Sequence, residues 1–255
     1  MRENDVRNEW DNSSKAWADF VRTGKDHDRE ELNNPAAFEL IGNIKGLTVL
    51  DLACGEGYNT RILARKGAKV TGIDFSPKQI ELAKQEEKKK NLGIKYMVMD
   101  AADLIGLPDN CFDLVTCFMA LQDIENHRKA ISETTRVLKP NGRFIFTIPH
   151  PCFEKITVNG KTINAADAYF GETKFPIHWN MKRLSTHFRT ISFHRTLTDY
   201  FDAISRSRLR VSKLIEPRFP EKAYRKHHHI NEAFTKPSSI IIEAVKVDLK
   251  KRPKK

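Results

Sequence analysis

Short apolar runs alternate with longer amphipathic segments over the first 150 residues. Runs rich in strand-forming residues occur at 49–52, 68–73, 94–99, 112–118 and 143–148. Between them, segments 58–66, 76–90 and 130–138 place apolar residues at helical spacing. Strands that alternate with helices predict βαβ units, in which helices cover both faces of a parallel sheet. The pattern therefore predicts an α/β, doubly wound fold.

The flanking segments carry other patterns. Residues 2–22 place Trp10, Trp17 and Val21 at helical spacing among charges, which predicts an amphipathic helix. Residues 24–31 are polar and predict a loop, and a helix is expected from Pro35 to near Gly42. Beyond the block, residues 197–205 predict a helix, and 209–215 and 238–247 the last two strands. Residues 151–196 are too long for an ordinary connection, so we expect an insertion that builds a substrate pocket.

The turn after the first strand, ACGEGY (53–58), is a candidate ligand-binding loop. Ligands of doubly wound sheets bind beyond the carboxyl ends of the strands. Gly55 and Gly57 let the backbone pass close to a ligand, where a Cβ would collide. The next helix begins there with free N–H groups that point into the same crevice. Asp74 ends the second strand about 20 residues further on, a position suited to holding two ribose hydroxyls.

The charge of this turn bears on the ligand. A nicotinamide fingerprint reads GxGxxG, but here the third glycine is missing. Asp51 and Glu56 place carboxylates where a pyrophosphate would lie. Negative charges repel phosphate and favour an ammonium or a sulfonium. The turn therefore favours a positively charged nucleoside over a dinucleotide.

Five motifs in residues 47–150 resemble, in order and spacing, those of class I S-adenosylmethionine-dependent methyltransferases. They are VLDLACGEG (49–57), GIDFSPKQIELA (72–83), VMDAADL (98–104), FDLVTCFMALQDIEN (112–126) and RVLKPNGRFIFTIPHP (136–151). Outside them, NNPAAFEL (33–40), HRTLTDYF (194–201) and LIEPR (214–218) resemble a prokaryotic subgroup whose substrates are mostly unassigned.

The resemblance implies a Rossmann-like, seven-stranded, mostly parallel sheet with an antiparallel last hairpin and a substrate-cap insertion. It divides one domain, 1–255, into an N-terminal lid segment (1–34), a cofactor-binding core (35–150), a cap insertion (151–196), and the last helix, strand hairpin and basic tail (197–255).

The same resemblance implies S-adenosylmethionine as cofactor and S-adenosylhomocysteine as product. Its cofactor contacts map onto the first strand and turn, the ends of the second and third strands, and the end of the fourth. The residues are Asp51, Ala53, Cys54, Gly55, Gly57, Asp74, Phe75, Asp100, Ala101, Phe118 and Met119. We add Arg29 as a candidate for the methionyl carboxylate, because a guanidinium pairs with a carboxylate in bidentate fashion.

Methyl transfer from a sulfonium releases a neutral thioether, so the leaving group needs no acid. Positioning the nucleophile supplies most of the catalysis, and a base is needed only for an acceptor that arrives protonated with a high pKa. The candidates are His150, just past the fifth strand, Asp123, at the mouth of the fourth, and His194. The expected acceptor is an O or N atom of a small metabolite. Five basic residues of the insertion favour an anionic one: Lys174, Lys182, Arg183, Arg189 and Arg195.

The net charge of +11 is unevenly distributed. Residues 1–125 hold 17 Lys and Arg against 22 Asp and Glu, whereas residues 126–255 hold 27 against 11. A basic second half with a basic tail keeps an RNA or protein methyltransferase as an alternative. A cofactor-binding protein without catalysis and a nicotinamide oxidoreductase are further alternatives.

Composition also limits location and metal content. No apolar run approaches about 18 residues and the N-terminus is charged, so we expect a cytoplasmic protein without a membrane partner. The four cysteines lack metal-ligand spacing and are expected to be reduced thiols. The run His227–His229 has no neighbouring Cys, Asp or Glu cluster, so we expect a basic surface and no metal there.

Overall fold

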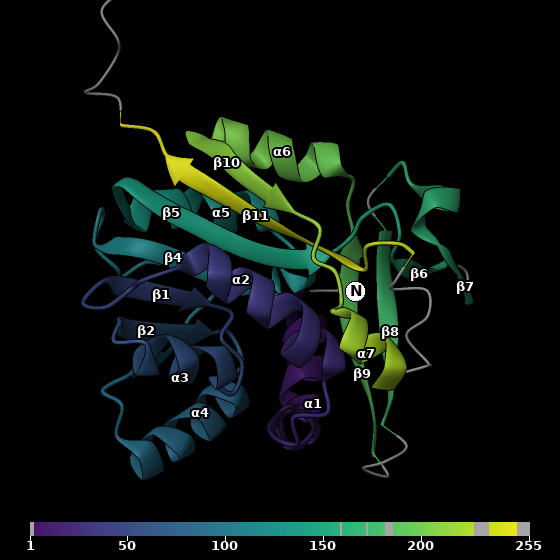
Figure 1. Cartoon of the computed structure of the whole chain (residues 1–255), viewed down its shortest axis with the longest axis horizontal. Helices are drawn as coiled ribbons and strands as arrows, with labels where there is room; N and C mark the ends of the chain where they lie inside the picture. The colour runs from purple at the N-terminus through teal and green to yellow at the C-terminus, as the bar shows by residue number, and fades with distance from the viewer. Residues whose placement is uncertain (1–2, 159, 172, 182–185, 227–234, 249–255) are drawn as a thin grey trace, which may run out of the picture.

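The structure, a computed structural model, describes residues 3–158, 160–171, 173–181, 186–226 and 235–248. Its centre is a seven-stranded sheet of order β10-β11-β5-β4-β1-β2-β3 (Figure 1). The strands are β1 (Thr48–Leu52), β2 (Lys69–Asp74), β3 (Lys95–Val98), β4 (Phe112–Phe118), β5 (Leu138–Pro149), β10 (Leu209–Ile215) and β11 (Ser239–Lys246). β1 to β5 pair in parallel, and β11 runs antiparallel between β5 and β10. The predicted fold class is confirmed.

Helices cover both faces of this sheet. One layer holds α2 (Asn34–Ile41), α3 (Tyr58–Arg65) and α4 (Pro77–Lys90). The opposite layer holds α5 (His127–Val137) and α6 (Leu197–Arg206) (Figure 1). Successive strand residues point to opposite faces. Val49 of β1 accordingly packs with the first layer, and Leu50 packs with the second.

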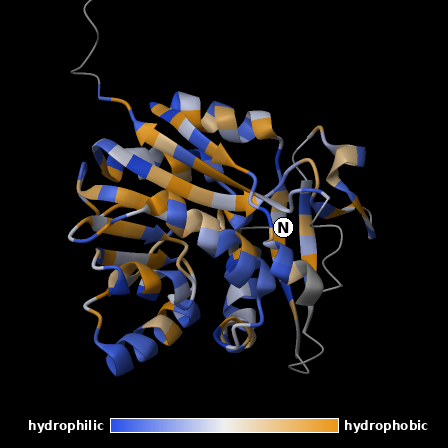
Figure 2. Cartoon of the chain, viewed as in Figure 1, coloured by the Kyte–Doolittle hydropathy of each residue, from blue (hydrophilic) through white to orange (hydrophobic). Residues whose placement is uncertain are grey.

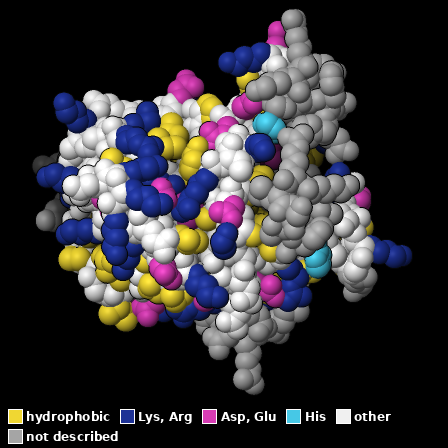
Figure 3. All heavy atoms as spheres, turned by 90° about the horizontal axis from the view of Figure 1, so that it is seen from below, with side chains coloured by type: hydrophobic (Ala, Val, Ile, Leu, Met, Phe, Trp, Pro, Cys, Tyr) yellow, Lys and Arg dark blue, Asp and Glu magenta, His cyan; other side chains and the backbone are white. Residues whose placement is uncertain are grey.

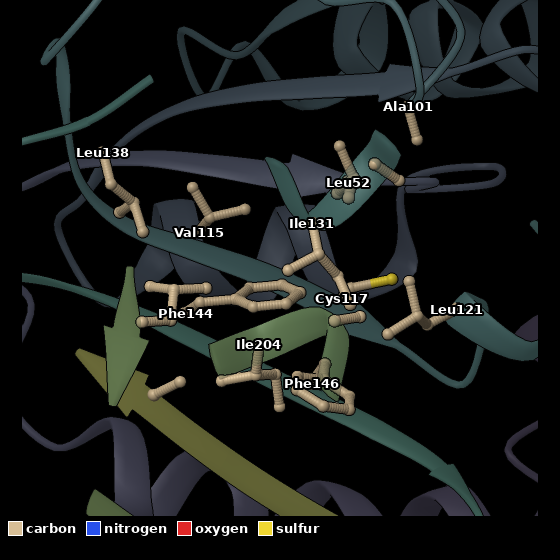
Figure 4. Packing of buried hydrophobic residues seen from close by; sticks show 14 of the residues in the cluster. Leu52, Ala101, Val115, Cys117, Leu121, Ile131, Leu138, Phe144, Phe146 and Ile204 are labelled. Carbon is tan, nitrogen blue, oxygen red and sulfur yellow. The ribbon is translucent and has the colours of Figure 1, made fainter. Parts of the chain in front are cut away.

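The core is a two-sided hydrophobic sandwich. Figure 4 shows Val115 and Cys117 of β4 and Phe144 and Phe146 of β5 packed beneath the α5 and α6 layer. Phe144 and Phe146 stack with ring centroids 4.9 Å apart. The central strands are accordingly apolar along most of their length, whereas α4 is largely hydrophilic (Figure 2). Burial on both faces explains why these strands read as continuous apolar runs rather than alternating ones.

Local signals set the helix starts. The Ser76 hydroxyl accepts a hydrogen bond from the Gln79 N–H at 3.1 Å, and Pro77 occupies the first position of α4. Thr196 and Asp199 form a reciprocal capping box at the start of α6. Both devices satisfy N–H groups that have no partner within the helix.

Two local predictions were wrong. The predicted loop at 24–31 contains the start of a π-helix, η1 (Asp28–Asn33), which runs directly into α2. Its last turn is held by the burial of Leu32 against Phe219 and Ala223, a contact that local sequence does not reveal. The strand predicted at 143–148 begins earlier, at Leu138, and in this extension Asn141 has a φ of 62° and the pairing with β4 shifts register.

The insertion forms two hairpins, and the second of them packs against α1 (Glu3–Arg22). They are β6 (Lys155–Val158) with β7 (Lys161–Asn164), and β8 (Thr173–Met181) with β9 (Thr186–His194), and the short helix η3 (Ala165–Ala168) lies between them. In Figure 1, α1 lies between the sheet and the β8–β9 hairpin. Val6 of α1 packs against Ile191 and Phe193 of β9. Helix α7 (Glu221–Lys226) precedes β11.

None of the helices in the described ranges combines the length and hydropathy that crossing a lipid bilayer requires.

Candidate active site

A cavity opens beyond the carboxyl ends of β1, β2, β3 and β4. It contains about 1150 Å³ of empty space, including open solvent at its mouth. Its lining comes from residues 6–126 and combines acidic side chains with aromatic ones from α1 and the strand ends. A concave, mainly apolar site with a few convergent polar groups is typical of a small-molecule pocket.

The two glycines of the turn meet different constraints. Gly55 lines the cavity at a φ of 56°, and a Cβ there would meet only the Gln79 amide oxygen, at 3.9 Å. Gly57 has a φ of 84° and does not line the cavity. A Cβ at Gly57 would overlap the Tyr96 ring, whose Cζ lies 2.9 Å away. Gly55 therefore leaves space for a ligand, whereas Gly57 allows the turn to pack on the protein.

Asp51 lies one residue before the end of β1, and both of its carboxylate oxygens accept hydrogen bonds. Thr60 donates to Oδ2 at 2.6 Å, and Thr116 of β4 donates to Oδ1 at 2.8 Å. The side chain is almost fully buried, and burial raises the pKa of Asp51 to about 6. The hydroxyls fix the orientation of this carboxylate at the edge of the cavity.

Asp74 links the turn to the end of β2. Its Oδ2 accepts the Gly55 N–H at 2.9 Å and its Oδ1 accepts the Ser76 N–H at 2.9 Å. Burial raises the pKa of Asp74 to about 6, and these two backbone donors oppose the shift. Asp74 therefore organises the glycine turn as well as lining the cavity.

Glu56 does not supply the free negative charge inferred from the sequence. Arg22, the last residue of α1, donates to Glu56 Oε2 at 2.9 Å, and Arg61 donates to both carboxylate oxygens at 2.9 and 3.0 Å. The Glu56 side chain is buried within this pair of cations. The prediction that Glu56 presents charge to a ligand was wrong, because two arginines neutralise it.

The ends of β3 and β4 supply the other expected lining residues. Asp100 Oδ1 accepts the Ala102 N–H at 2.8 Å, and Ala101 follows it in the lining. Phe118 stacks on Phe38 with ring centroids 5.5 Å apart. Met119 has a φ of 48°, and its carbonyl accepts the Gln122 amide at 2.8 Å. Ala53, Cys54 and Phe75 also line the cavity.

Arg29 of η1 lies between two aromatic rings at the cavity wall. Its guanidinium is 5.3 Å from the centroid of the Trp17 ring and 5.5 Å from that of Tyr58. Its Nη2 is 3.6 Å from Asp26. Its Nη1 is buried and has no hydrogen-bond partner among the described residues. The arrangement leaves a donor available to an anionic group inside the cavity.

Asp123 closes the short helix η2 (Leu121–Asp123) and lines the cavity. Its Oδ1 is shielded from solvent and, within the described part of the chain, accepts no hydrogen bond. Burial raises the pKa of Asp123 to about 8, and the Ser192 hydroxyl and the Arg195 charge oppose the shift. Among the three candidate bases, only this one is in the cavity lining.

His150 and His194 lie outside that lining. His150 Nε2 is 3.0 Å from Glu216 Oε1, and its Nδ1 accepts the Cys152 N–H at 3.2 Å. His194 is fully buried, with Nδ1 2.6 Å from Glu154 Oε1 and Nε2 3.1 Å from the Tyr169 carbonyl. Both imidazoles are held by protein groups, so the geometry does not bring either histidine together with Asp123 at the cavity.

The role of the insertion in a substrate pocket stays a prediction. No described residue of 151–196 lines the cavity. Three of its cations are held by protein groups: Arg189 pairs with Glu9, Lys174 pairs with the lining residue Glu125 at 3.4 Å, and Arg195 donates to backbone carbonyls. Lys182 and Arg183 lie outside the described residues. The three described cations, Lys174, Arg189 and Arg195, therefore do not line this cavity.

Sequence reasoning missed several lining residues, including Gln79, Met99, Ile124, Glu125 and Asn126. The sequence does carry a signal for Gln79: it lies three residues after the helix cap Ser76, in the first turn of α4, at the end of the helix that faces the cavity. Both polar atoms of its amide are buried and lack a partner among the described residues. The described side chains contain no cluster of His, Cys, Asp or Glu suited to a metal ion, and His227–His229 lie outside the described ranges.

Comparison with known proteins adds independent information. Residues 50–146 match the family described as "Methyltransferase domain". An uncharacterized protein of Haemophilus influenzae is 26% identical over 234 residues, which cover 86% of this chain and 89% of that protein. A ubiquinone biosynthesis O-methyltransferase of Alkalilimnicola ehrlichii is 30% identical over 121 residues, covering 48% of this chain and 49% of the relative. The chain thus spans only about half the length of this named relative.

Solved structures share the fold. A methyltransferase from Mesorhizobium loti, described as S-adenosylmethionine-dependent, superposes with a TM-score of 0.68 at 24% identity, over 83% of this chain and 96% of that one. A phosphoethanolamine N-methyltransferase of Haemonchus contortus, solved with S-adenosylhomocysteine, gives a TM-score of 0.59 at 20% identity, over 84% of this chain and 52% of that one. Residues 50–146 therefore match a methyltransferase domain, and the chain shares its fold with structures described as S-adenosylmethionine-dependent methyltransferases.

Proposed function

We propose that the chain transfers the methyl group of S-adenosylmethionine to an O or N atom of a small molecule bound in this cavity. The observation that carries the proposal is the position of Asp123. Its unpartnered carboxylate oxygen lies in the same lining as the strand-end acids Asp51, Asp74 and Asp100. One cavity thereby combines a nucleoside-binding arrangement with a group that can accept a proton.

The cofactor is proposed to lie across the strand ends. Asp74 would receive the ribose hydroxyls, Asp100 and the Ala101 N–H the adenine, and the buried donor of Arg29 the methionyl carboxylate. Asp51 and the turn residues Ala53, Cys54 and Gly55 would contact the methionyl part, with Phe75 beside the nucleoside and Phe118 and Met119 near the methyl. Gly57 would not contact the cofactor; it would allow the turn to form, because the Tyr96 ring fills the space that a side chain at position 57 would need.

The reaction proposed is an in-line displacement. The acceptor lone pair forms the new bond to the methyl carbon as the carbon–sulfur bond breaks, and its electrons return to sulfur as a neutral thioether. The acceptor proton passes to Asp123 Oδ1, a base whose pKa of about 8 is close to neutral pH. Asp123, rather than His150 or His194, is therefore the proposed base.

The acceptor is proposed to be small and without a required negative charge. The described cations of the insertion do not line the cavity, and each of them is engaged by protein groups, so they give no basis for a preference for an anionic acceptor. The named relative acts, by its description, in ubiquinone biosynthesis, which supports a small-molecule acceptor. An RNA or protein acceptor is the second candidate, resting on the basic second half of the chain alone. We further propose that residues 1–255 form a single domain that binds both the cofactor and the acceptor.

Isothermal titration calorimetry separates these functions. S-adenosylhomocysteine should bind the wild-type protein and NAD should not. Asp123→Asn should keep S-adenosylhomocysteine affinity and lose turnover of small hydroxyl and amine acceptors, measured as S-adenosylhomocysteine release. Asp103→Asn, an exposed carboxylate on the loop after β3, is the matched control. Full turnover by the Asp123 variant would overturn the base assignment, and NAD binding would overturn the cofactor.

A further inference from the structure

Arg195 is a buried arginine at the end of the insertion. It follows β9 directly and its side chain is 1% exposed. Its Nη1 donates to the Leu121 carbonyl at 3.3 Å, and its Nη2 donates to the carbonyls of Ile124 and Glu125 at 2.8 and 3.0 Å. All three acceptors belong to the short loop after β4, which we name the acceptor loop (residues 119–126).

These contacts add to the hydrogen bonds of the loop itself, such as that from the Asp123 N–H to the Ala120 carbonyl at 2.8 Å. η2 is a single 3₁₀ turn, and such turns have poor internal hydrogen-bond geometry. A guanidinium in the interior is costly unless its donors are satisfied, and its planar fork can serve several carbonyls at once. One lysine ammonium cannot reproduce that fork. The backbone on both sides of Asp123 is therefore held from the insertion through Arg195.

The insertion also reaches the Asp123 side chain. The Ser192 hydroxyl of β9 hydrogen-bonds the Asp123 carboxylate, and the Arg195 charge lowers its pKa. Of the other charged groups nearby, Glu154 raises that pKa, and Glu154 is itself paired with His194 at 2.6 Å. Arg195 further stacks on Phe193, with its Cζ 4.8 Å from the ring centroid, which ties it to the face that packs on α1.

We propose that Arg195 is a positioning residue that holds the acceptor loop and sets the ionisation of Asp123, so that the insertion acts on methyl transfer through this loop. The proposal rests on the proposed role of Asp123 as base. In this proposal the insertion holds the backbone of the acceptor loop.

Two substitutions separate the hydrogen bonds from the charge. Arg195→Lys keeps the charge but loses the fork, and Arg195→Met loses both. Arg206→Met on α6 is the matched control, because the side chain of Arg206 is 77% exposed. Hydrogen exchange of backbone amides in residues 119–126 should accelerate about tenfold in both Arg195 variants, as expected for losing a hydrogen bond to a charged group. The control should exchange like wild type.

The pH at which Asp123 ionises is a second readout, because it would not change if Arg195 had a structural role alone. The Tm of each protein is compared with that of its Asp123→Asn counterpart from pH 5 to pH 9. This difference should fall as pH rises and level off near pH 8 in wild type, level off at the same pH in Arg195→Lys, and level off at a higher pH in Arg195→Met. If Arg195→Met does not fold, the lysine variant still tests the loop by exchange.

The outcomes are distinct. If the backbone amides of residues 119–126 exchange at wild-type rates in Arg195→Lys, the proposal that Arg195 holds the acceptor loop is overturned. If the difference levels off at the same pH in a folded Arg195→Met protein as in wild type, the electrostatic role is overturned. Either result can occur while S-adenosylhomocysteine still binds and Asp123→Asn is still inactive, in which case the proposed function stands without this inference. Loss of S-adenosylhomocysteine binding in wild type would instead contradict the proposed function.

Discussion

At the scale of single residues, Asp74 has two roles: it accepts hydrogen bonds from backbone N–H groups of the glycine turn and of Ser76, and it is the proposed ribose contact. Asp74→Ala should weaken S-adenosylhomocysteine binding about tenfold to a hundredfold, because a hydrogen bond to a charged group contributes about 1.5–3 kcal/mol. Part of this loss reflects the Gly55 and Ser76 N–H groups, which lose their acceptor. Calorimetry measures the affinity, with the exposed Asp202→Ala as control. Unchanged affinity would remove Asp74 from the ribose site.

The two turn glycines should respond differently to the same substitution. Gly55→Val should abolish S-adenosylhomocysteine binding while lowering Tm only modestly, because its side chain would enter the cavity and the cost is backbone strain at a φ of 56°. Gly57→Val should lower Tm much more, because its side chain would meet the Tyr96 ring. Thermal melts with and without the ligand distinguish the two. Equal Tm values for the two variants would contradict the packing account.

The raised pKa of Asp123 predicts how stability depends on pH. Its folded pKa is about 8 and its unfolded pKa about 3.9, so the folded state binds a proton more tightly. The contribution to stability is full below about pH 4 and is lost as pH rises to 8. Wild type should therefore lose Tm relative to Asp123→Asn between pH 5 and pH 9. Turnover should follow the opposite trend, because the base must be ionised; a rate that falls from pH 6 to pH 8 would exclude Asp123 as base.

At the scale of elements, α1 is attached to the core at several points. Asp11 accepts hydrogen bonds from the Ser76 hydroxyl and the Lys78 N–H at the start of α4. Arg22 reaches Glu56 in the glycine turn. Because Val6, Trp10, Trp17 and Val21 line the cavity, this helix covers whatever the cavity holds. Its attachment should therefore influence how fast the cofactor leaves.

Arg22→Met tests that expectation. Removing the bond to buried Glu56 should loosen the end of α1 and accelerate dissociation of S-adenosylhomocysteine, while Arg61 still neutralises Glu56. Stopped-flow displacement measures the rate. Lys15→Met on the same helix is the control, since Lys15 is exposed and its partner among the described residues is the exposed Asp19. Equal dissociation rates for the two variants would show that this end of α1 does not restrain the ligand.

At the scale of the whole molecule, charge and site are separated along the chain. The cavity lining comes from residues 6–126, the acidic half, whereas the excess of Lys and Arg lies beyond residue 125. Figure 3 shows Lys and Arg side chains spread over the lower face among acidic and apolar ones. Truncation after Asp248, just past β11, should therefore leave S-adenosylhomocysteine affinity and Tm unchanged. A clear loss of affinity would implicate the tail in the site and favour the RNA or protein alternative.

Periodicity and local chemistry in the sequence were sufficient for the parallel strands, the helices between them, the Ser76 cap and the strand-end acids. Each depends on residues close together in the chain: a strand of period two or a buried apolar run, a helix of period 3.6, a cap three residues from its donor. Because the carboxyl ends of parallel strands meet at one edge, Asp51, Asp74 and Asp100 were brought together by topology alone.

The tertiary structure decided what those side chains face. Whether Glu56 meets a ligand or an arginine depends on Arg22, 34 residues away, and the partners of His194 and Arg195 lie 40 and 71 residues away. The insertion packs behind α1 and the acceptor loop instead of lining the cavity, because Ile191 and Phe193 bury themselves against Val6. Such pairings are set by burial and by the direction of side chains in the folded chain, and no local spacing encodes them.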